Sequence, residues 1–183
     1  MPLYLADTHE CEGKTMKTLE IVGENYCGKW QKSRTACRGI VLNGENLLLS
    51  YAARTGEYML PGGGVEGSET DRECCIREIV EESGVMTEPS ECKLEIIEYY
   101  GDERFVNRYF LCRQIGSAQR HLTKAEEELG MEARWVPLSR MQAVFGAHQS
   151  YAGTNEERRG IYLREYTALT ELGLWDEGST MHE

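Results

Sequence analysis

The chain has 183 residues, of which 40% are hydrophobic, so it can bury one sizeable core and a single domain is expected. Its formal net charge of −11 argues against a nucleic-acid partner, because no stripe of Lys and Arg is present to neutralise a phosphate backbone. No apolar run is long enough to span a membrane and no signal peptide is recognised, so neither a membrane location nor secretion is expected.

The N-terminal residues and the cysteines indicate little about function. Residues 1–33 are predicted to be an N-terminal extension, and Met16 offers an alternative start that would leave 1–15 as a poorly ordered addition. Seven cysteines, an odd number, show neither CxxC pairing nor zinc-site spacing. Cys74 and Cys75 are adjacent in a predicted helix, which favours packing over a disulfide. A reducing cytoplasm is therefore the expected compartment.

Strands are predicted before and after a central acidic helix. The first two, 35–42 and 46–53, are joined by Asn43-Gly44, a dipeptide typical of tight hairpins. A short extended segment at 58–60 leads into Pro61 and three glycines, which let the backbone approach a ligand closely. The later strands are predicted at 93–100, 106–114 and 132–136.

The acidic helix is predicted over 69–83, with Ser68 as its N-cap and Asp71 as a weaker capping-box acid. At about 100° per residue, three acids fall within one arc of the helix: Glu78, Glu81 and Glu82. Three apolar side chains occupy a different arc, which suits burial against a sheet: Ile76, Ile79 and Val80. One face of the helix is therefore predicted to pack while the other presents carboxylates.

Carboxylates at that spacing repel one another by about 0.2–0.5 kcal/mol per pair on a bare helix. A solvated acidic face is the ordinary explanation of such a run. Here the acids follow a glycine turn and are accompanied by Arg77 and a closing Gly84, which favours a site for hard cations. Mg²⁺ takes a few carboxylate ligands, keeps several waters and completes its shell with substrate phosphate oxygens.

Two helices are predicted after the last strand, at 138–145 and 155–172. The second has a stripe predicted to be buried, made of Ile161, Tyr162, Tyr166, Leu169 and Leu172. Strands, one helix, further strands and closing helices predict an α/β fold in which helices cover both faces of a mixed sheet. The segment 146–183 is expected to pack on the same domain or to serve in a homodimer.

Residues 63–85 carry a pattern with nine specified positions, G-x5-E-x7-R-E-U-x-E-E-x-G-U, where U is aliphatic. The stretch resembles the Nudix box and matches it at every specified position. A chance match in a chain of this length is on the order of one in a million. The resemblance covers roughly residues 34–145, taken as a Nudix hydrolase domain, and implies an α/β/α sandwich. It assigns no subfamily.

The resemblance implies a hydrolase that cleaves a nucleoside diphosphate linked to a group X, giving a nucleoside monophosphate and phosphorylated X. Water would attack one phosphorus in line, and Mg²⁺ or Mn²⁺ would acidify that water and neutralise the leaving group. The metal ligands would be the Gly63 carbonyl and the carboxylates of Glu78, Glu81 and Glu82. Glu78 and Glu81 would also take part in catalysis. Arg77 would hold these glutamates, and Glu69 would pair with Arg77 as structural support.

The general base differs among members of this family, which use either a glutamate of the box or an acid from a downstream loop. This chain offers Glu126-Glu127-Glu128 in a segment expected to be a loop before the strand at 132–136. Glu126 is the predicted base, although a solvated acidic loop explains each of the three equally well. A base must lie within hydrogen-bond reach of the water, which only a structure can test.

The substrate is the least determined part of the prediction. Arg54, ahead of the glycine turn, is a candidate phosphate contact, although a solvated hairpin arginine is the commoner case. Tyr58 is a candidate for stacking a nucleobase, but aromatic side chains in strands usually lie in the core. The same holds for Tyr99, Tyr100, Tyr109 and Phe110. Markers of ADP-ribose, coenzyme A and dinucleoside polyphosphate hydrolases are missing or misplaced, so the group X stays open.

Two other functional classes share this fold. A diphosphate isomerase needs a catalytic cysteine and metal-binding histidines, and the four histidines here form no cluster in the sequence. A non-catalytic nucleotide sensor is expected to lose glutamates of the box, whereas here the box is intact. A hydrolase of a small nucleotide derivative is therefore the leading hypothesis.

Overall fold

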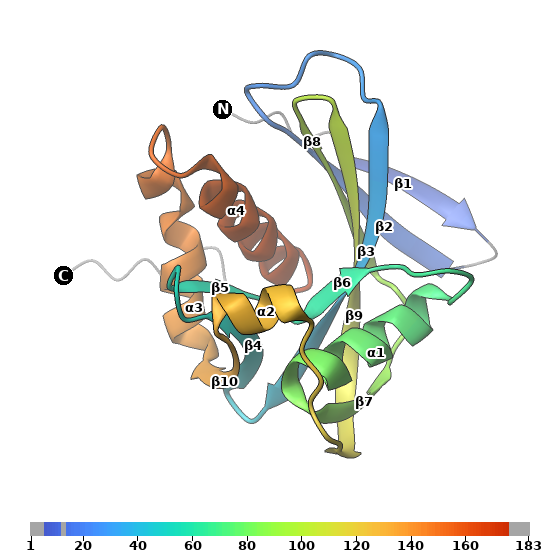
Figure 1. Cartoon of the computed structure of the whole chain (residues 1–183). Helices are drawn as coiled ribbons and strands as arrows, with labels where there is room; N and C mark the ends of the chain where they lie inside the picture. The colour runs from blue at the N-terminus through green and yellow to red at the C-terminus, as the bar shows by residue number, and fades with distance from the viewer. Residues whose placement is uncertain (1–5, 12–13, 176–183) are drawn as a thin grey trace.

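The computed structural model describes the backbone of residues 6–11 and 14–175 and the side chains of residues 16–175. Within these residues, ten strands form one mixed sheet (Figure 1). The strands are β1 (Ala6–Cys11), β2 (Lys14–Val22), β3 (Lys32–Asn43), β4 (Asn46–Ala52), β5 (Glu57–Met59), β6 (Gly62–Gly64), β7 (Val85–Pro89), β8 (Leu94–Tyr100), β9 (Glu103–Ser117) and β10 (Met131–Pro137).

The strand order across the sheet is β1-β2-β8-β9-β3-β4-β10, while β5, β6 and β7 pair with β4, β3 and β9. β2 runs parallel to β8 and β3 runs parallel to β9, whereas pairs such as β8 with β9 and β4 with β10 are antiparallel. The predicted mixed sheet is therefore confirmed. The predicted hairpin is also present, since Asn43 pairs with Asn46 and Gly44 has a φ of 59°.

The strands β1 and β2 are absent from the sequence prediction, which treats residues 1–33 as an extension. β2 lies beside β8 in the sheet and buries Leu19 and Ile21. The proposal that residues 1–15 are poorly ordered falls partly on residues 1–5 and 12–13, which lie outside the described residues. A pairing between segments so far apart in the chain leaves no local pattern, so it could not be predicted from β2 alone.

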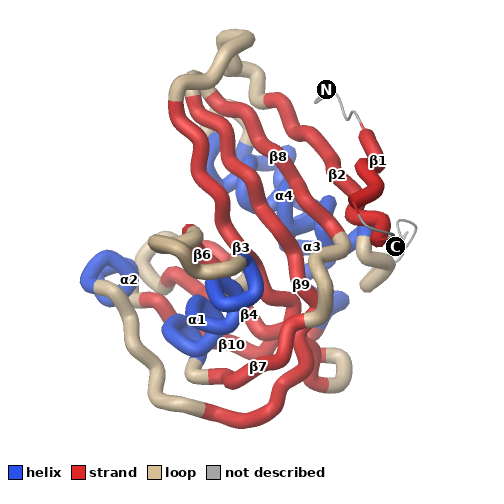
Figure 2. Tube along the Cα trace, turned by 90° about the vertical axis from the view of Figure 1, so that its right-hand side faces the viewer, coloured by secondary structure: helices blue, strands red, loops and turns tan. Residues whose placement is uncertain are grey.

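Helices cover both faces of the sheet, as predicted. Figure 2 shows α1 (Asp71–Ser83) in front of the sheet and α3 (Leu138–Gly146) and α4 (Glu156–Glu171) behind it. A short helix α2 (Lys124–Leu129) lies near α1, and the 3-10 helix η1 (Ala147–Tyr151) joins α3 to the loop before α4. No helix in the described part of the chain is long and apolar enough to cross a membrane.

The core has two layers, one on each face of the sheet. β3 contributes to both, because Cys37 and Val41 pack in the layer under α1 while Ile40 packs in the layer under α3 and α4. Side chains of a strand alternate between faces, so a strand covered on both sides must be apolar on both. The stripe predicted for α4 belongs to the second layer, with Tyr162 and Leu169 fully buried and the rest packed against it.

The N-terminus of α1 differs from the prediction. The N-cap is Thr70 rather than Ser68, and the capping-box acid is Glu73 rather than Asp71. Residues before Thr70 form a turn in which the Glu66 amide donates to Glu69 Oε1 at 2.7 Å and the Glu69 amide donates to the Glu66 carbonyl. Because Glu69 is held in this turn, the helix begins only after it.

The buried face of α1 also differs from the prediction. Ile79 is fully buried as expected, but Ile76 and Val80 are only half-buried, and Cys74 and Cys75 take the other buried positions. The cysteines whose side chains the structure describes are free thiols, so the packing role predicted for Cys74 and Cys75 is confirmed. The small thiols let α1 approach β3 closely, where Ile79 fits over Gly39.

This packing predicts unequal effects of two isoleucine substitutions in α1. Ile79→Ala is expected to lower the free energy of unfolding by about 2–5 kcal/mol, because it leaves a cavity over Gly39. Ile76→Ala, the matched control on the same helix, is expected to cost less than half as much because Ile76 is already half-exposed. Urea unfolding of both variants measures the difference, and equal losses would contradict the assigned helix orientation.

Candidate active site

The glycine strand β6 brings backbone against the acidic helix. β6 pairs with β3, and Gly63 lies opposite Cys37. A Cβ at Gly63 would lie 2.4 Å from Oε1 of Glu78, closer than real Cβ atoms come. Gly62 has a φ of 153°, and a Cβ there would lie 2.2 Å from the Cys37 carbonyl oxygen. Both positions require glycine, so the Glu78 carboxylate rests directly against the Gly63 backbone.

Arg77 is the hub of the acidic cluster. Its Nε and Nη2 donate to both oxygens of Glu69, at 3.0 and 2.7 Å. Its Nη1 donates to Glu78 at 2.8 Å and to Glu81 at 3.1 Å, and Nη2 also donates to the Gly64 carbonyl at 3.0 Å. The paired guanidinium lowers the pKa of Glu69 to about 2. One arginine thus ties the turn before α1, the glycine strand and two of the helix acids together.

The three acids of the motif have different environments. Glu82 is buried, and one of its oxygens accepts a hydrogen bond from Ser50 of β4. Burial raises the pKa of Glu82 to about 8 and also raises the pKa of Glu78, which Arg77 partly offsets. The Glu81 side chain is about one-third exposed, at 36%. The helix therefore presents one accessible and two buried carboxylates.

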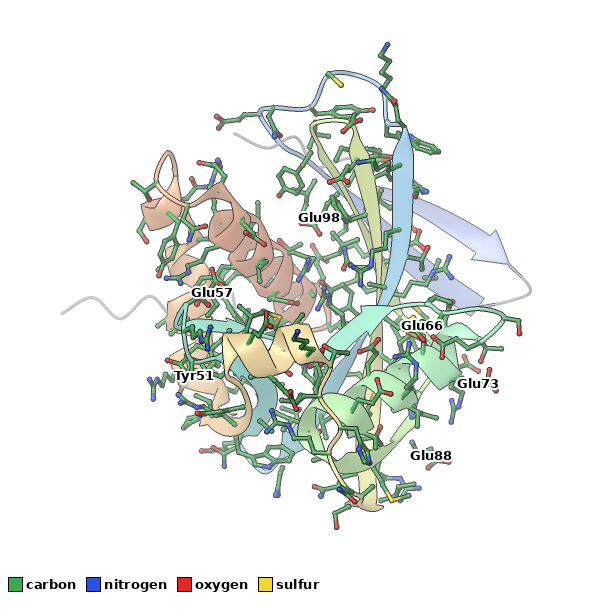
Figure 3. All side chains as sticks on the ribbon, in the orientation of Figure 1. Tyr51, Glu57, Glu66, Glu73, Glu88 and Glu98 are labelled. Atoms are coloured by element: carbon green, nitrogen blue, oxygen red, sulfur yellow. The ribbon has the colours of Figure 1, made fainter. Side chains whose placement is uncertain are left out.

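A cavity of about 570 Å³ opens beside these acids and is lined by residues of β3, β6, β9, α1, α2 and α4. Its acidic lining is Glu66, Glu78, Glu81, Glu82 and Glu126. Its basic lining is Arg34, Arg38, Arg77 and Arg164. Figure 3 shows Glu66 beside β6 and α1, and Glu98, which contacts Arg164, between α4 and the sheet. The cavity is large enough for a nucleotide-sized ligand.

Comparison with known proteins identifies this arrangement. The sequence model of the NUDIX domain matches residues 32–155, a span that holds the glycine strand, α1 and Glu126. The chain belongs to the Nudix family. As a member it is a hydrolase of pyrophosphate bonds, and its glutamate motif is intact. No curated protein matches the chain.

Solved structures with the Nudix fold resemble the chain over most of their length. A NUDIX hydrolase from Nitrosomonas europaea aligns with a TM-score of 0.55 and 17% identity, covering 80% of this chain and 99% of the other. The ORF135 protein of E. coli aligns with a TM-score of 0.50 and 18% identity, covering 80% and 96%. At such low sequence identity the likeness supports a shared fold and nothing more. Substrate preference must be argued from the site itself.

Glu126 lies at the Nudix cavity, in α2 rather than in the expected loop. Its Oε2 accepts from the Thr123 amide at 2.7 Å and from the Thr123 hydroxyl at 2.8 Å, which closes a capping box. Glu126 is half-buried and lines the cavity, whereas Glu127 and Glu128 are exposed. Its charge also contributes to the raised pKa values of Glu78 and Glu82.

The two candidate substrate contacts lie away from the cavity lining. Arg54 is exposed in the turn after β4. Tyr58 is buried, with its ring 4.6 Å from that of Tyr51 and its hydroxyl accepting from Arg134. Of the other aromatic candidates, Tyr109 and Phe110 are core residues. We therefore assign no substrate contact to Arg54 or Tyr58.

Several residues that line the cavity were missed by sequence reasoning, among them Arg38, Asn107 and Arg164. Arg38 lies in a predicted strand and Arg164 in a predicted amphipathic helix, where each would ordinarily be a solvated charge. A usable signal did exist in α4, because Arg164-Glu165 interrupts the apolar stripe between Tyr162 and Leu169. A charged pair inside a buried stripe indicates a polar group that the fold must satisfy.

The carboxylate oxygens that accept no hydrogen bond in this site suit a hard cation. Arg77 occupies one oxygen each of Glu78 and Glu81, and Ser50 occupies one of Glu82. The second oxygen of each carboxylate has no donor among the described residues. Within the described part of the chain, no group of three or more His, Cys, Asp or Glu is already spaced as metal ligands. The donor set is all oxygen, which suits Mg²⁺ or Mn²⁺.

The raised pKa of Glu82 predicts a pH-dependent stability of the metal-free protein. Folded Glu82 keeps its proton up to about pH 8 while the unfolded carboxyl loses it near 4.5, so stability falls as pH rises from about 4.5 to 8 and levels off above that. Between about pH 6 and pH 9 the wild type is expected to lose about 2–3 kcal/mol more than Glu82→Gln. Urea unfolding in EDTA measures this, and parallel pH profiles for the two proteins would contradict it.

Proposed function

We propose that this Nudix protein is a divalent-metal-dependent hydrolase of nucleoside diphosphates linked to another group X, releasing a nucleoside monophosphate and phosphorylated X. The observation that supports it is the placement of three motif glutamates and the Gly63 backbone on one wall of a nucleotide-sized cavity. A cluster of carboxylates cannot bind a diphosphate directly, since both are anionic. A cation between them is therefore required.

We propose the Gly63 carbonyl, Glu78, Glu81 and Glu82 as the residues that hold Mg²⁺ or Mn²⁺. Bound there, the cation would supply Lewis-acid chemistry, lowering the pKa of water and neutralising charge on the leaving phosphate. The protein's own contribution is to position these ligands. Arg77 directs one oxygen of Glu78 and one of Glu81, Glu69 orients Arg77, and Ser50 orients Glu82.

We propose Glu126 as the general base that takes the proton from the attacking water. It faces the cavity from α2, across from the acids of α1, and its Oε1 has no donor among the described residues. The Thr123 bonds to Oε2 hold the carboxylate in one orientation. Glu81, the most exposed acid of the motif, is the alternative base within the helix.

The cellular setting is also part of the proposal. Free buried thiols suit a reducing cytoplasm, and the acidic chain suits a small nucleotide derivative carried with its metal rather than a nucleic acid. A homodimer stays a prediction. A non-catalytic nucleotide sensor or a diphosphate isomerase would show binding without hydrolysis of any diphosphate, which the following measurements distinguish.

Glu81→Gln is expected to lower Mg²⁺-dependent hydrolysis by at least about a hundredfold, since several kcal/mol of transition-state stabilisation would be lost. The assay uses a panel of NDP-sugars, nucleoside triphosphates, dinucleotides and ADP-ribose, with Mn²⁺ affinity as a second readout. Glu88→Gln, on an exposed residue of β7, is the matched control and should keep wild-type activity (Figure 3). Removal of metal with EDTA should abolish the wild-type reaction. A wild type silent across the panel would refute the proposed function.

The role of Glu126 is separable from metal binding. Glu126→Gln is expected to lower kcat by about 10²–10⁴-fold while Mn²⁺ affinity changes little, because a base acts on the water. Glu127→Gln, on the exposed neighbour in α2, should have wild-type kcat. If both variants retain activity, the base belongs to the helix motif instead.

A further inference from the structure

A largely buried polar cluster links the sheet to α4. It lies next to the wall of the cavity formed by Glu78, Glu81 and Glu82, here called the acidic wall. The cluster consists of Arg38 (β3), Glu98 (β8), Asn107 (β9), Arg164 and Glu165 (α4). Arg38 Nε donates to Asn107 Oδ1 at 3.1 Å, and Asn107 Nδ2 donates to Glu98 at 2.9 Å. Arg164 donates to Glu98 at 3.1 Å and to Glu165 at 2.9 Å. Three of the five residues, Arg38, Asn107 and Arg164, line the cavity.

The cluster has no net charge, but some of its arginine N–H groups have no hydrogen-bond acceptor among the described residues. Two arginines are balanced by two glutamates, with Arg38 also 3.9 Å from Glu165. The Arg164 side chain is only 9% exposed, and its Nε has no hydrogen-bond partner. Arg38 is only partly buried; its Nη1 donates to the Leu60 carbonyl, and its Nη2 has no acceptor among the described residues. A buried donor without an acceptor, such as Arg164 Nε, is costly, so this surface favours a ligand that brings acceptors.

The position of the cluster limits which part of a nucleotide could reach it. Arg38 lies next to the glycine strand, since a Cβ at Gly62 would be 3.0 Å from Arg38 Cγ. Phe105, two residues before Asn107 on the same face of β9, lines the cavity and is half-exposed. Met59 and Met131 add apolar lining. Beyond the acidic wall the cavity thus offers an aromatic ring, apolar side chains and uncompensated N–H donors.

We propose that Arg38, Asn107 and Arg164 select a nucleobase through its ring carbonyl groups, with Phe105 packed against the face of the base. This inference rests on the proposed function, and it assigns the substrate class to bases that carry oxo groups, such as hypoxanthine, guanine and uracil. A neutral cluster attracts an uncharged acceptor, whereas phosphates go to the cation at the acidic wall. Adenine presents an amino group where hypoxanthine presents a carbonyl. The N–H donors of the arginines would then face another donor and could not form a hydrogen bond.

The test compares inosine monophosphate with adenosine monophosphate, which differ at the C6 substituent and the proton on N1. Titration calorimetry with the full chain, in EDTA and again with Mg²⁺, is expected to show at least tenfold tighter binding of the inosine nucleotide. Arg38→Lys keeps the positive charge but replaces the planar guanidinium fork with a single ammonium nitrogen, and it should reduce the preference to less than threefold. Arg104→Lys, on β9 and outside the cavity lining, is the matched control and should keep the wild-type preference.

A further variant keeps the proposal testable if Arg38→Lys does not fold. Phe105→Leu should weaken both nucleotides about equally and leave their ratio unchanged, because stacking does not distinguish the bases. Equal or tighter binding of adenosine monophosphate by the wild type would overturn the proposal. So would binding of ribose 5-phosphate as tight as that of inosine monophosphate, since a sugar or a phosphate would then occupy the cluster.

The base preference and the proposed hydrolysis can fail separately. A protein that prefers inosine monophosphate but hydrolyses no diphosphate in Mg²⁺ would retain the base site and refute the enzyme. A protein that hydrolyses inosine and adenosine diphosphate derivatives with equal kcat/KM, and binds both monophosphates equally, would retain the enzyme and refute the base site.

Discussion

The set of hydrogen bonds made by Arg77 is the constraint on which the site depends. Four carboxylates approach one another where α1 meets the glycine strand, and two of them, Glu78 and Glu82, are buried. Removing the compensating partner of a buried charge typically costs about 3–5 kcal/mol. A guanidinium holds several acceptors at once because its N–H donors form a rigid planar fork. A lysine has a single ammonium nitrogen and could not make the same set of contacts. Arg77 therefore offsets part of the negative charge of the cluster and sets the geometry of Glu69, Glu78 and Glu81.

The glycines act with Arg77 and not independently of it. Gly63 provides the space into which the Glu78 carboxylate fits, and the neighbouring Gly64 carbonyl accepts from Arg77 Nη2. A side chain at Gly63 would displace Glu78 and so break one of the Arg77 contacts. The glycine strand and the acidic helix are thus a single unit, although they come from opposite ends of the motif.

The sequence predicts the parts of this protein that depend on local spacing. The helical arc of Glu78, Glu81 and Glu82, the Asn43-Gly44 hairpin and the helices on both faces all follow from neighbours in the chain. The prediction fails where distant contacts decide. Ser68 has the chemistry of an N-cap, but Glu69 must stay outside the helix to reach Arg77, so Thr70 caps instead. Likewise, Arg38 and Arg164 are ordinary charges in the sequence, and only the packing of α4 on the sheet brings them to Asn107 and Glu98.

The parallel pairing of β2 with β8 and of β3 with β9 has a consequence for how the chain folds. Lys17 pairs with Leu94 and Lys32 with Glu103, so these two parallel pairings join segments that have the whole acidic helix between them in the chain. Pairing strands that are far apart in the chain requires a long loop to close, and its entropy is lost before the stabilising contacts form. Folding is therefore slowed. During synthesis from the N-terminus, β2 and β3 would wait unpaired along these edges until β8 and β9 emerge. The nascent chain therefore exposes strand edges, and it is the newly made protein, not the folded one, that is most prone to aggregate.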